Sequence, residues 1–152
     1  MPPHSRGRDA NCLRDVKSLN VFLSSIHGVK LGDFGTARTL ETLMTGNIGS
    51  QLWMAREVFR AYDYNPSQDD DRTLYTSAAD IYSFGITLSE VETGHKPYAN
   101  HDGNVIASVH AGMLRPDLGQ ACPRWLRKLA TACWAQKPSS RPTAQQIIKF
   151  LT

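Results

Sequence analysis

Four polar residues near the beginning of the chain have the types needed to do chemistry together: Asp15, Lys17, Asn20 and Asp33. A carboxylate can accept a proton as a base, and a lysine ammonium can neutralise the charge of a phosphate. The side-chain oxygens of Asn20 and Asp33 are the ligands preferred by a hard, partly hydrated cation such as Mg²⁺. These types predict a site at which a base, a metal and a phosphate meet.

Two short apolar runs separate Asn20 from Asp33 and should set the distance between them. Residues 21–23 and 29–31 have the composition of strands, and residues 24–28 between them end in a glycine. This pattern predicts a β-hairpin. Because the open ends of a hairpin lie together, we expect Asn20 and Asp33 to lie side by side.

Two motifs here resemble the catalytic loop and the metal-binding motif of protein kinases, Arg14-Asp15-Val16-Lys17-Ser18-Leu19-Asn20 and Asp33-Phe34-Gly35. Asp-Phe-Gly alone is a weak signal, because it can occur by chance beside a polar loop. Both motifs in this order and at this spacing are a specific signal.

The resemblance implies a role for each matched residue. Asp15 would accept the proton of a substrate hydroxyl, and Lys17 would neutralise the transferring phosphoryl group. Asn20 and Asp33 would hold Mg²⁺. Phe22 would form the floor of the adenine pocket of ATP, although simple core packing also explains an aromatic residue in a strand. The implied cofactors are ATP and Mg²⁺, and the implied substrate is a protein.

Residues 49–57 resemble the end of a kinase activation segment. Ser50 matches the hydroxyl that hydrogen-bonds Asp15 and Lys17 in Ser/Thr kinases, and Lys17 itself favours Ser/Thr over Tyr specificity. Two positions depart from the family pattern, since Leu13 replaces a histidine and Arg56 replaces a proline. The preceding loop offers candidate phosphorylation sites that could pair with Arg14 and Arg38, namely Thr39, Thr42 and Thr45. For any one of them, a solvated hydroxyl is the simpler interpretation.

A buried helix is predicted from Ser77 to Val91, because apolar residues recur at offsets of three and four. Its predicted buried positions are Ile81, Phe84, Leu88 and Val91. Asp80, at its beginning, matches the family aspartate that binds backbone amides of the catalytic loop. An aspartate there could also simply cap its own helix.

Further helices are predicted towards the end of the chain. Residues 123–134 have an apolar face, and Thr143 with Gln146 forms a capping-box pattern before residues 147–151. Arg141 in this region matches the family residue that pairs with Glu57, which would tie the activation segment to the helices. The Cys-Pro, Cys-Trp and Arg-Pro-Thr patterns resemble the tyrosine-kinase-like group of kinases.

The predicted organisation is a polar tail over residues 1–12 and a kinase C-terminal lobe over residues 13–152. No glycine-rich loop, Val-Ala-Ile-Lys strand or helix glutamate precedes the catalytic loop. The expected fold is therefore mainly α with a small β-hairpin, resembling a truncated kinase large lobe whose small lobe is absent. The function so implied is a Ser/Thr kinase domain with impaired activity on its own. The alternatives are a pseudokinase-like binding module and a truncated product without function.

Composition and charge limit the kinds of partner and the cellular compartment that we expect. The 152 residues are 41% hydrophobic and 20% charged, which is ordinary for one globular domain. The net charge of +3 is too small to argue for nucleic acid or membrane binding, so neither is expected as a partner. Three sparse cysteines indicate thiols in a reducing compartment rather than a disulfide framework. With no apolar signal segment at the start, a cytoplasmic location is expected.

Overall fold

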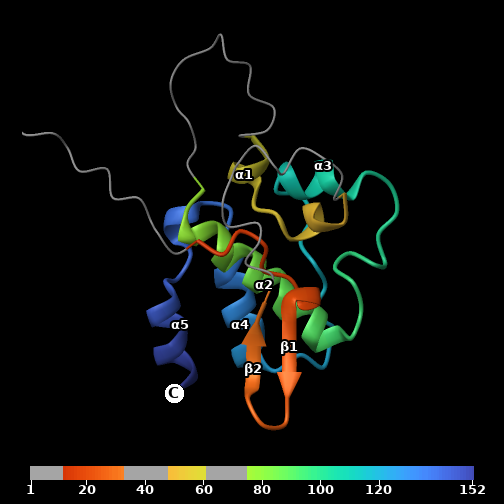
Figure 1. Ribbon diagram of the computed structural model, residues 1–152. Helices are drawn as coiled ribbons and strands as arrows, with labels where there is room; N and C mark the ends of the chain where they lie inside the picture. The colour runs from red at the N-terminus through yellow and green to blue at the C-terminus, as the bar shows by residue number, and fades with distance from the viewer. Residues whose placement is uncertain (1–11, 33–47, 61–74) are drawn as a thin grey trace, which may run out of the picture.

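The computed structural model describes residues 12–32, 48–60 and 75–152. Asp33, Phe34, Gly35, the candidate phosphorylation sites and most of the predicted tail lie outside these ranges. The described elements, in chain order, are η1 (Ser18–Asn20), β1 (Val21–Ser24), β2 (Gly28–Leu31), η4 (Ile48–Trp53), α1 (Arg56–Arg60), α2 (Ser77–Thr93), α3 (Val105–His110), α4 (Arg124–Cys133), η5 (Pro138–Ser140) and α5 (Ala144–Leu151). The expectation of a mainly α fold with one hairpin is confirmed for this part of the chain (Figure 1).

The predicted hairpin is present, and each strand is one residue longer at the turn than expected. β1 and β2 pair antiparallel with Val21 opposite Leu31. Gly28 has φ 67°, a left-handed conformation that glycine adopts without the steric cost of a Cβ atom. Beyond the last pair, the Gly32 amide donates to the Asn20 carbonyl at 2.8 Å. The residues that flank the two strands are therefore held together at the open end.

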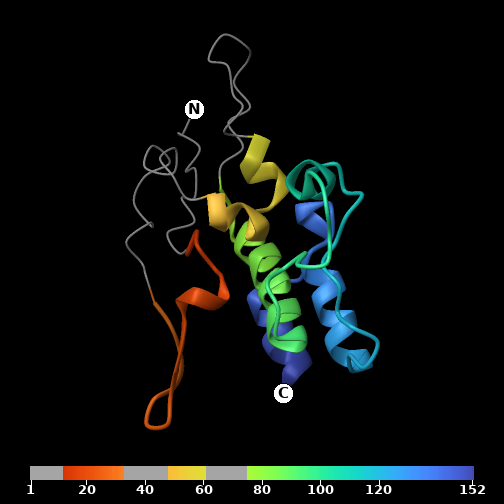
Figure 2. The same ribbon diagram turned by 90° about the vertical axis from the view of Figure 1, so that its right-hand side faces the viewer.

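Helix α2 lies at the centre of the helical body, with α4 beside it in both views (Figures 1 and 2). It ends at Gly94, which has φ 69° and whose amide donates to the carbonyl of Glu90. Gly85 allows α4 to approach closely, because a Cβ atom there would lie only 2.7 Å from Cys133 Cβ. The close contact between the two helices therefore depends on the missing side chain.

Two apolar clusters cover different sides of α2. The first joins α2 to η4, α1 and α4 through Trp53, Ala55, Val58, Ala79, Tyr82, Ile86, Leu118, Cys122, Leu126, Ala130 and Trp134. The second packs Ile81, Phe84 and Leu88 against Leu129, Cys133 and Ile147. Together they hold α2 between the η4–α1 segment and the C-terminal helices.

One predicted core position is wrong. Val91 was expected on the buried face of α2, but its side chain is 74% exposed. The second cluster contacts Ile81, Phe84 and Leu88, and it does not extend to the last turn of the helix, where Val91 lies. The three other positions are only partly buried, whereas Tyr82 and Ile86 are 2% and 0% exposed. Periodicity therefore did not select the most buried residues of α2, and it cannot tell how far along a helix its neighbours reach.

The capping box before α5 is confirmed. Thr143 accepts from the Gln146 amide, and the Gln146 side chain accepts from the Thr143 amide. This pair satisfies two backbone donors that would otherwise have no intrahelical partner. Among the described residues, no helix combines the length and apolar character that crossing a bilayer requires.

Candidate active site

Asp80 holds the beginning of the predicted catalytic loop. Its carboxylate accepts from the backbone amides of Leu13 at 2.7 Å and Arg14 at 2.9 Å. Arg14 has φ 66°, an uncommon conformation for a residue with a side chain, and the hydrogen bonds that Asp80 accepts from two consecutive amides hold the chain where it enters that conformation. Of the two interpretations of Asp80, the structure supports the bond to the loop.

Tyr75 adds a third donor to Asp80, with its hydroxyl 2.6 Å from Oδ1. Burial, and then the neighbouring Asp80 carboxylate, raise the pKa of the Tyr75 hydroxyl well above its usual range. The hydroxyl therefore keeps its proton and remains a donor. Sequence reasoning did not identify Tyr75, because only the fold shows that a tyrosine five positions before Asp80 reaches back to it.

Asp15, Lys17 and Asn20 form one polar cluster. Lys17 Nζ lies 2.6 Å from Asp15 Oδ2, and Asn20 Nδ2 donates to the same oxygen at 2.9 Å and to the Asp15 carbonyl at 2.8 Å. Lys17 and Asn20 are buried, with exposed fractions of 7% and 5%. Both donors use Oδ2, and among the described residues no hydrogen bond involves Oδ1. The arrangement orients the carboxylate while leaving one oxygen able to accept a proton.

Lys17 also connects this cluster to η4. Its Nζ lies 3.0 Å from Ser50 Oγ, across 33 positions of the chain. The sequence predicted that Ser50 would bond both Asp15 and Lys17, and the described residues show the bond to Lys17. The lysine therefore bridges the predicted base and the predicted end of the activation segment.

The predicted magnesium ligands can be examined only at Asn20. Its side-chain hydrogen bonds to described residues are all made by Nδ2, which leaves the side-chain oxygen Oδ1, the atom type that Mg²⁺ accepts. Within the described ranges no group of three or more His, Cys, Asp and Glu side chains could hold a metal ion. Asn20 is thus suited to contribute one oxygen, and Asp33 lies outside those ranges.

Phe22 is not a core residue. Its side chain is 56% exposed, so the interpretation as simple core packing is wrong. The ring lies over Gly32, where a Cβ atom would be 2.5 Å from Phe22 Cε2. An aromatic face that is open to solvent and supported from one side can stack on a flat ligand.

Glu57 and Arg141 form the expected pair. Arg141 donates to both carboxylate oxygens, at 2.5 and 3.0 Å, and also to the carbonyls of Ala78 and Ala135. The Arg141 side chain is fully buried and that of Glu57 is 17% exposed. Among the described residues, Arg56 makes no ion pair with Glu57, so the departure at that position has not displaced Arg141. The pair joins α1 to the segment before α5.

Sequence reasoning missed a second carboxylate on α2 that contacts this region. Glu90 accepts from the Ser18 hydroxyl and from the Trp53 indole. Ser83, also on α2, donates to the Trp53 carbonyl at 2.8 Å. The only sequence signal was an acidic residue in a helix that is otherwise largely apolar, and that signal does not name its partners.

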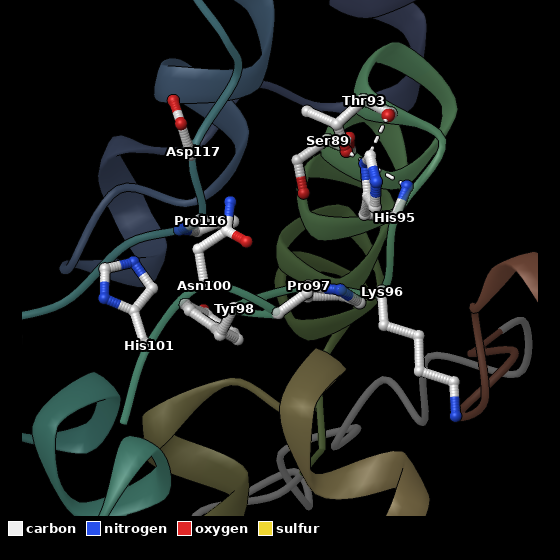
Figure 3. A pocket seen from close by; sticks show the side chains of 11 residues that line it. Ser89, Thr93, His95, Lys96, Pro97, Tyr98, Asn100, His101, Pro116 and Asp117 are labelled. Carbon is white, nitrogen blue, oxygen red and sulfur yellow. Dashed lines mark hydrogen bonds between the residues drawn. The ribbon is translucent and has the colours of Figure 1, made fainter. Parts of the chain in front are cut away.

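A small hollow lies elsewhere, at the C-terminal end of α2 (Figure 3). Its volume is about 40 Å³, which is enough to hold water. In Figure 3 the His95 ring turns back towards Thr93, whose carbonyl lies 2.6 Å from His95 Nδ1. None of the predicted site residues lines this hollow. We therefore place the candidate site at the catalytic-loop cluster.

Comparison with known proteins shows the family to which the chain belongs. Residues 9–151 match the family model for protein tyrosine and serine/threonine kinases. The chain is 38% identical to a probable serine/threonine-protein kinase of Dictyostelium discoideum, over 91% of this chain and 14% of that protein. It is 37% identical to human mitogen-activated protein kinase kinase kinase 7 over 98% of this chain, and 40% identical to the mouse serine/threonine-protein kinase A-Raf over 89%. It spans 23% of the length of each of the latter two.

Proposed function

The chain belongs to the family of protein tyrosine and serine/threonine kinases, and from that premise we propose that residues 13–152 form the large lobe of a protein Ser/Thr kinase. The proposed reaction transfers the γ-phosphoryl group of ATP to a Ser or Thr hydroxyl of a protein. The observation that carries this proposal is the cluster of Asp15, Lys17 and Asn20, linked to η4 through Ser50.

In this proposal, each polar side chain of the catalytic loop and its neighbours has a separate role in the reaction. As the substrate oxygen bonds to the γ-phosphorus and the bond to ADP breaks, Asp15 Oδ1 takes the hydroxyl proton. Lys17 places a positive charge beside the base, where it can offset charge on the transferring group. Asn20 and Asp33 would hold Mg²⁺, which supplies charge neutralisation for the phosphates when bound. Asp80 and Arg14 fix the loop on which these groups lie.

Ser/Thr specificity is supported by the bond from Lys17 to Ser50. That bond links the base region to η4, which overlaps the predicted end of the activation segment and would face a protein substrate. The Asp-Phe-Gly motif that Phe34 and Gly35 complete and the candidate Thr phosphorylation sites before η4 remain predictions.

We further propose that the polypeptide of residues 1–152 has weak activity by itself. Phe22 is the residue predicted to contact adenine, and the sequence of residues 1–152 contains no glycine-rich loop and no partner lysine for the phosphates. The hairpin and the preceding η1 also expose large apolar side chains, at Leu19, Phe22, Leu23, Ile26 and Val29. Apolar surface of this extent is the kind that another segment or domain covers in a working protein.

A chimera tests the proposal. Residues 13–152 would be joined to the small lobe and first helix of an active relative, and transfer of phosphate to a generic protein would be measured. We expect reduced but measurable activity, because Leu13 and Arg56 depart from the family at supporting positions only. A displacement of Asp15 by about 1 Å costs on the order of 10²-fold in rate.

The variants of the chimera assign the roles. Asp33→Ala should abolish transfer and Asp15→Asn should lower it strongly, while Arg56→Pro should restore part of the lost rate. A folded chimera that binds MgATP but transfers no phosphate, even with Leu13→His and Arg56→Pro, would refute the enzyme and favour a pseudokinase-like binding module.

A further inference from the structure

Glu90 lies where a helix does not favour a negative charge. It is in the last turn of α2, close to the partial negative charge at a helix C-terminus. Its two carboxylate oxygens have different partners, since Oε1 accepts from Ser18 Oγ at 3.0 Å and Oε2 accepts from Trp53 Nε1 at 2.7 Å. Hydrogen bonds to an ionised group are shorter and stronger than neutral ones. The two donors therefore offset the unfavourable position.

The partners of Glu90 belong to the two segments that the candidate site must align. Ser18 directly follows Lys17, and Trp53 lies in η4, as does Ser50. Those segments already meet through the Lys17–Ser50 bond at 3.0 Å. Glu90 adds a second connection between them, which is anchored on the central helix and passes through a Trp53 side chain that is only 6% exposed.

We propose that Glu90 is a positioning residue for the catalytic loop and η4. Asp80 binds the loop before Asp15, through the amides of Leu13 and Arg14. Glu90 binds it after Lys17, through Ser18, so that hydrogen bonds from both sides of this segment reach α2. The bond from Glu90 to Trp53 then fixes η4 against the same helix. With either end released, Lys17 loses the fixed geometry that lets it bond Asp15 and Ser50 together.

The bridge itself is testable in the 152-residue chain without any activity. Glu90→Gln keeps one carbonyl oxygen but replaces the other acceptor with an amide that cannot accept a hydrogen bond. The matched control is Glu92→Gln, which removes the same charge from the same helical turn at a carboxylate that has no hydrogen-bond partner among the described residues. The Trp53 indole N–H signal would be followed by nuclear magnetic resonance and assigned by its loss in Trp53→Phe.

We expect Glu90→Gln to shift the indole signal and to speed its hydrogen exchange by on the order of 10-fold, as the loss of a hydrogen bond to a charged group predicts. Ser18→Ala removes a donor instead of the acceptor, and it should loosen the catalytic loop while the Trp53 bond persists. An indole that is unchanged in Glu90→Gln would overturn the bridge. If Glu90→Gln does not fold, Trp53→Phe releases the η4 end of the bridge instead, and unchanged exchange rates of the amides around Ser18 in that variant would overturn the coupling of the catalytic loop to η4.

The catalytic consequence rests on the proposed function and is measured in the chimera. Glu90→Gln should lower kcat by about 10-fold to 10²-fold and leave the KM for MgATP nearly unchanged. In a variant that already carries Ser18→Ala and Trp53→Phe, adding Glu90→Gln should cause no further loss, because residues that act as one unit are not additive. Glu92→Gln should behave as the parent does.

The two hypotheses fail in different ways. An inactive parent chimera with an intact Glu90-dependent indole signal refutes the kinase proposal and retains the bridge. An active chimera whose kcat does not change with Glu90→Gln refutes the positioning role. A loss of rate that multiplies with the losses from Ser18→Ala and Trp53→Phe also refutes it, since Glu90 would then act by some route other than these two partners.

Discussion

Replacing Arg141 with alanine tests whether the Glu57–Arg141 pair holds α1 against the C-terminal segment. The arginine side chain is fully buried and donates to both Glu57 oxygens and to two carbonyls, those of Ala78 and Ala135. Its guanidinium also lies 5.0 Å from the Tyr82 ring centroid. Arg141→Ala removes all of these interactions at once and leaves a carboxylate without its partner.

The expected cost is about 3–5 kcal/mol in the free energy of unfolding, the range for breaking a buried ion pair from one side. Within it we expect the lower half, because Glu57 is 17% exposed and water can solvate part of the released carboxylate. Urea denaturation of the 152-residue chain, followed by circular dichroism, would measure the change.

Two further variants separate the causes. Arg56→Ala removes the neighbouring cation, which makes no ion pair with Glu57 among the described residues, and it should change stability by no more than about 0.5 kcal/mol. Adding Glu57→Gln to Arg141→Ala should recover part of the loss, because no unpaired charge remains. An Arg141→Ala cost near zero, or one matched by Arg56→Ala, would refute the assignment of the pair.

Three other predictions concern ligand binding, packing and a thiol. Titration calorimetry of residues 1–152 with MgATP should give a dissociation constant no tighter than roughly millimolar, on the order of −4 kcal/mol, and a micromolar value would contradict the one-sided site. Gly85→Ala should destabilise the chain by about 1–3 kcal/mol in urea denaturation despite its better helix propensity, because the added Cβ meets Cys133 Cβ, whereas Val91→Ala at the exposed end of α2 should be nearly neutral. Burial raises the pKa of the Cys133 thiol to about 12, so the thiol should resist alkylation at pH 9 until urea unfolds the chain. The stabilisation from keeping this thiol neutral should be complete below pH 9 and should be lost as the pH rises towards 12.

Elements with local signals were predictable from the sequence. The hairpin, the beginning of α2 and the α5 capping box each depend on residues close in the chain, such as Gly28, Ser77 and Thr143. The pairing of Glu57 with Arg141 was also predicted, although the residues lie far apart, because a family motif marks both. The exposure of Val91 was not predictable, since it depends on where the neighbouring helices end.

The missed contacts share a different origin. The sequence does not show which partners the side chains of Tyr75, Glu90 and Trp53 have. The packed position of α2 brings Tyr75 to Asp80 and Trp53 to Glu90. Asp33 marks the opposite case, because its role follows from a motif while its position lies outside the described residues. Sequence motifs therefore named the proposed reacting groups and one group that holds them, Asp80, and the fold added Tyr75 and Glu90.

Apolar packing and hydrogen bonding contribute differently to the candidate site, and this difference predicts which mutations should affect stability and which should affect rate. Apolar contacts have no preferred direction, so the two clusters around α2 can place helices but cannot fix the rotation of a loop to within an ångström. Hydrogen bonds are directional, and here the acceptors are two carboxylates on α2, those of Asp80 and Glu90. Substitutions in the clusters should therefore lower stability more than they lower the rate of the folded fraction. Substitutions at Asp80 and Glu90 should lower the phosphoryl-transfer rate of the folded protein more than they lower the free energy of unfolding. At each position, the loss of rate compared with the loss of stability tests this argument.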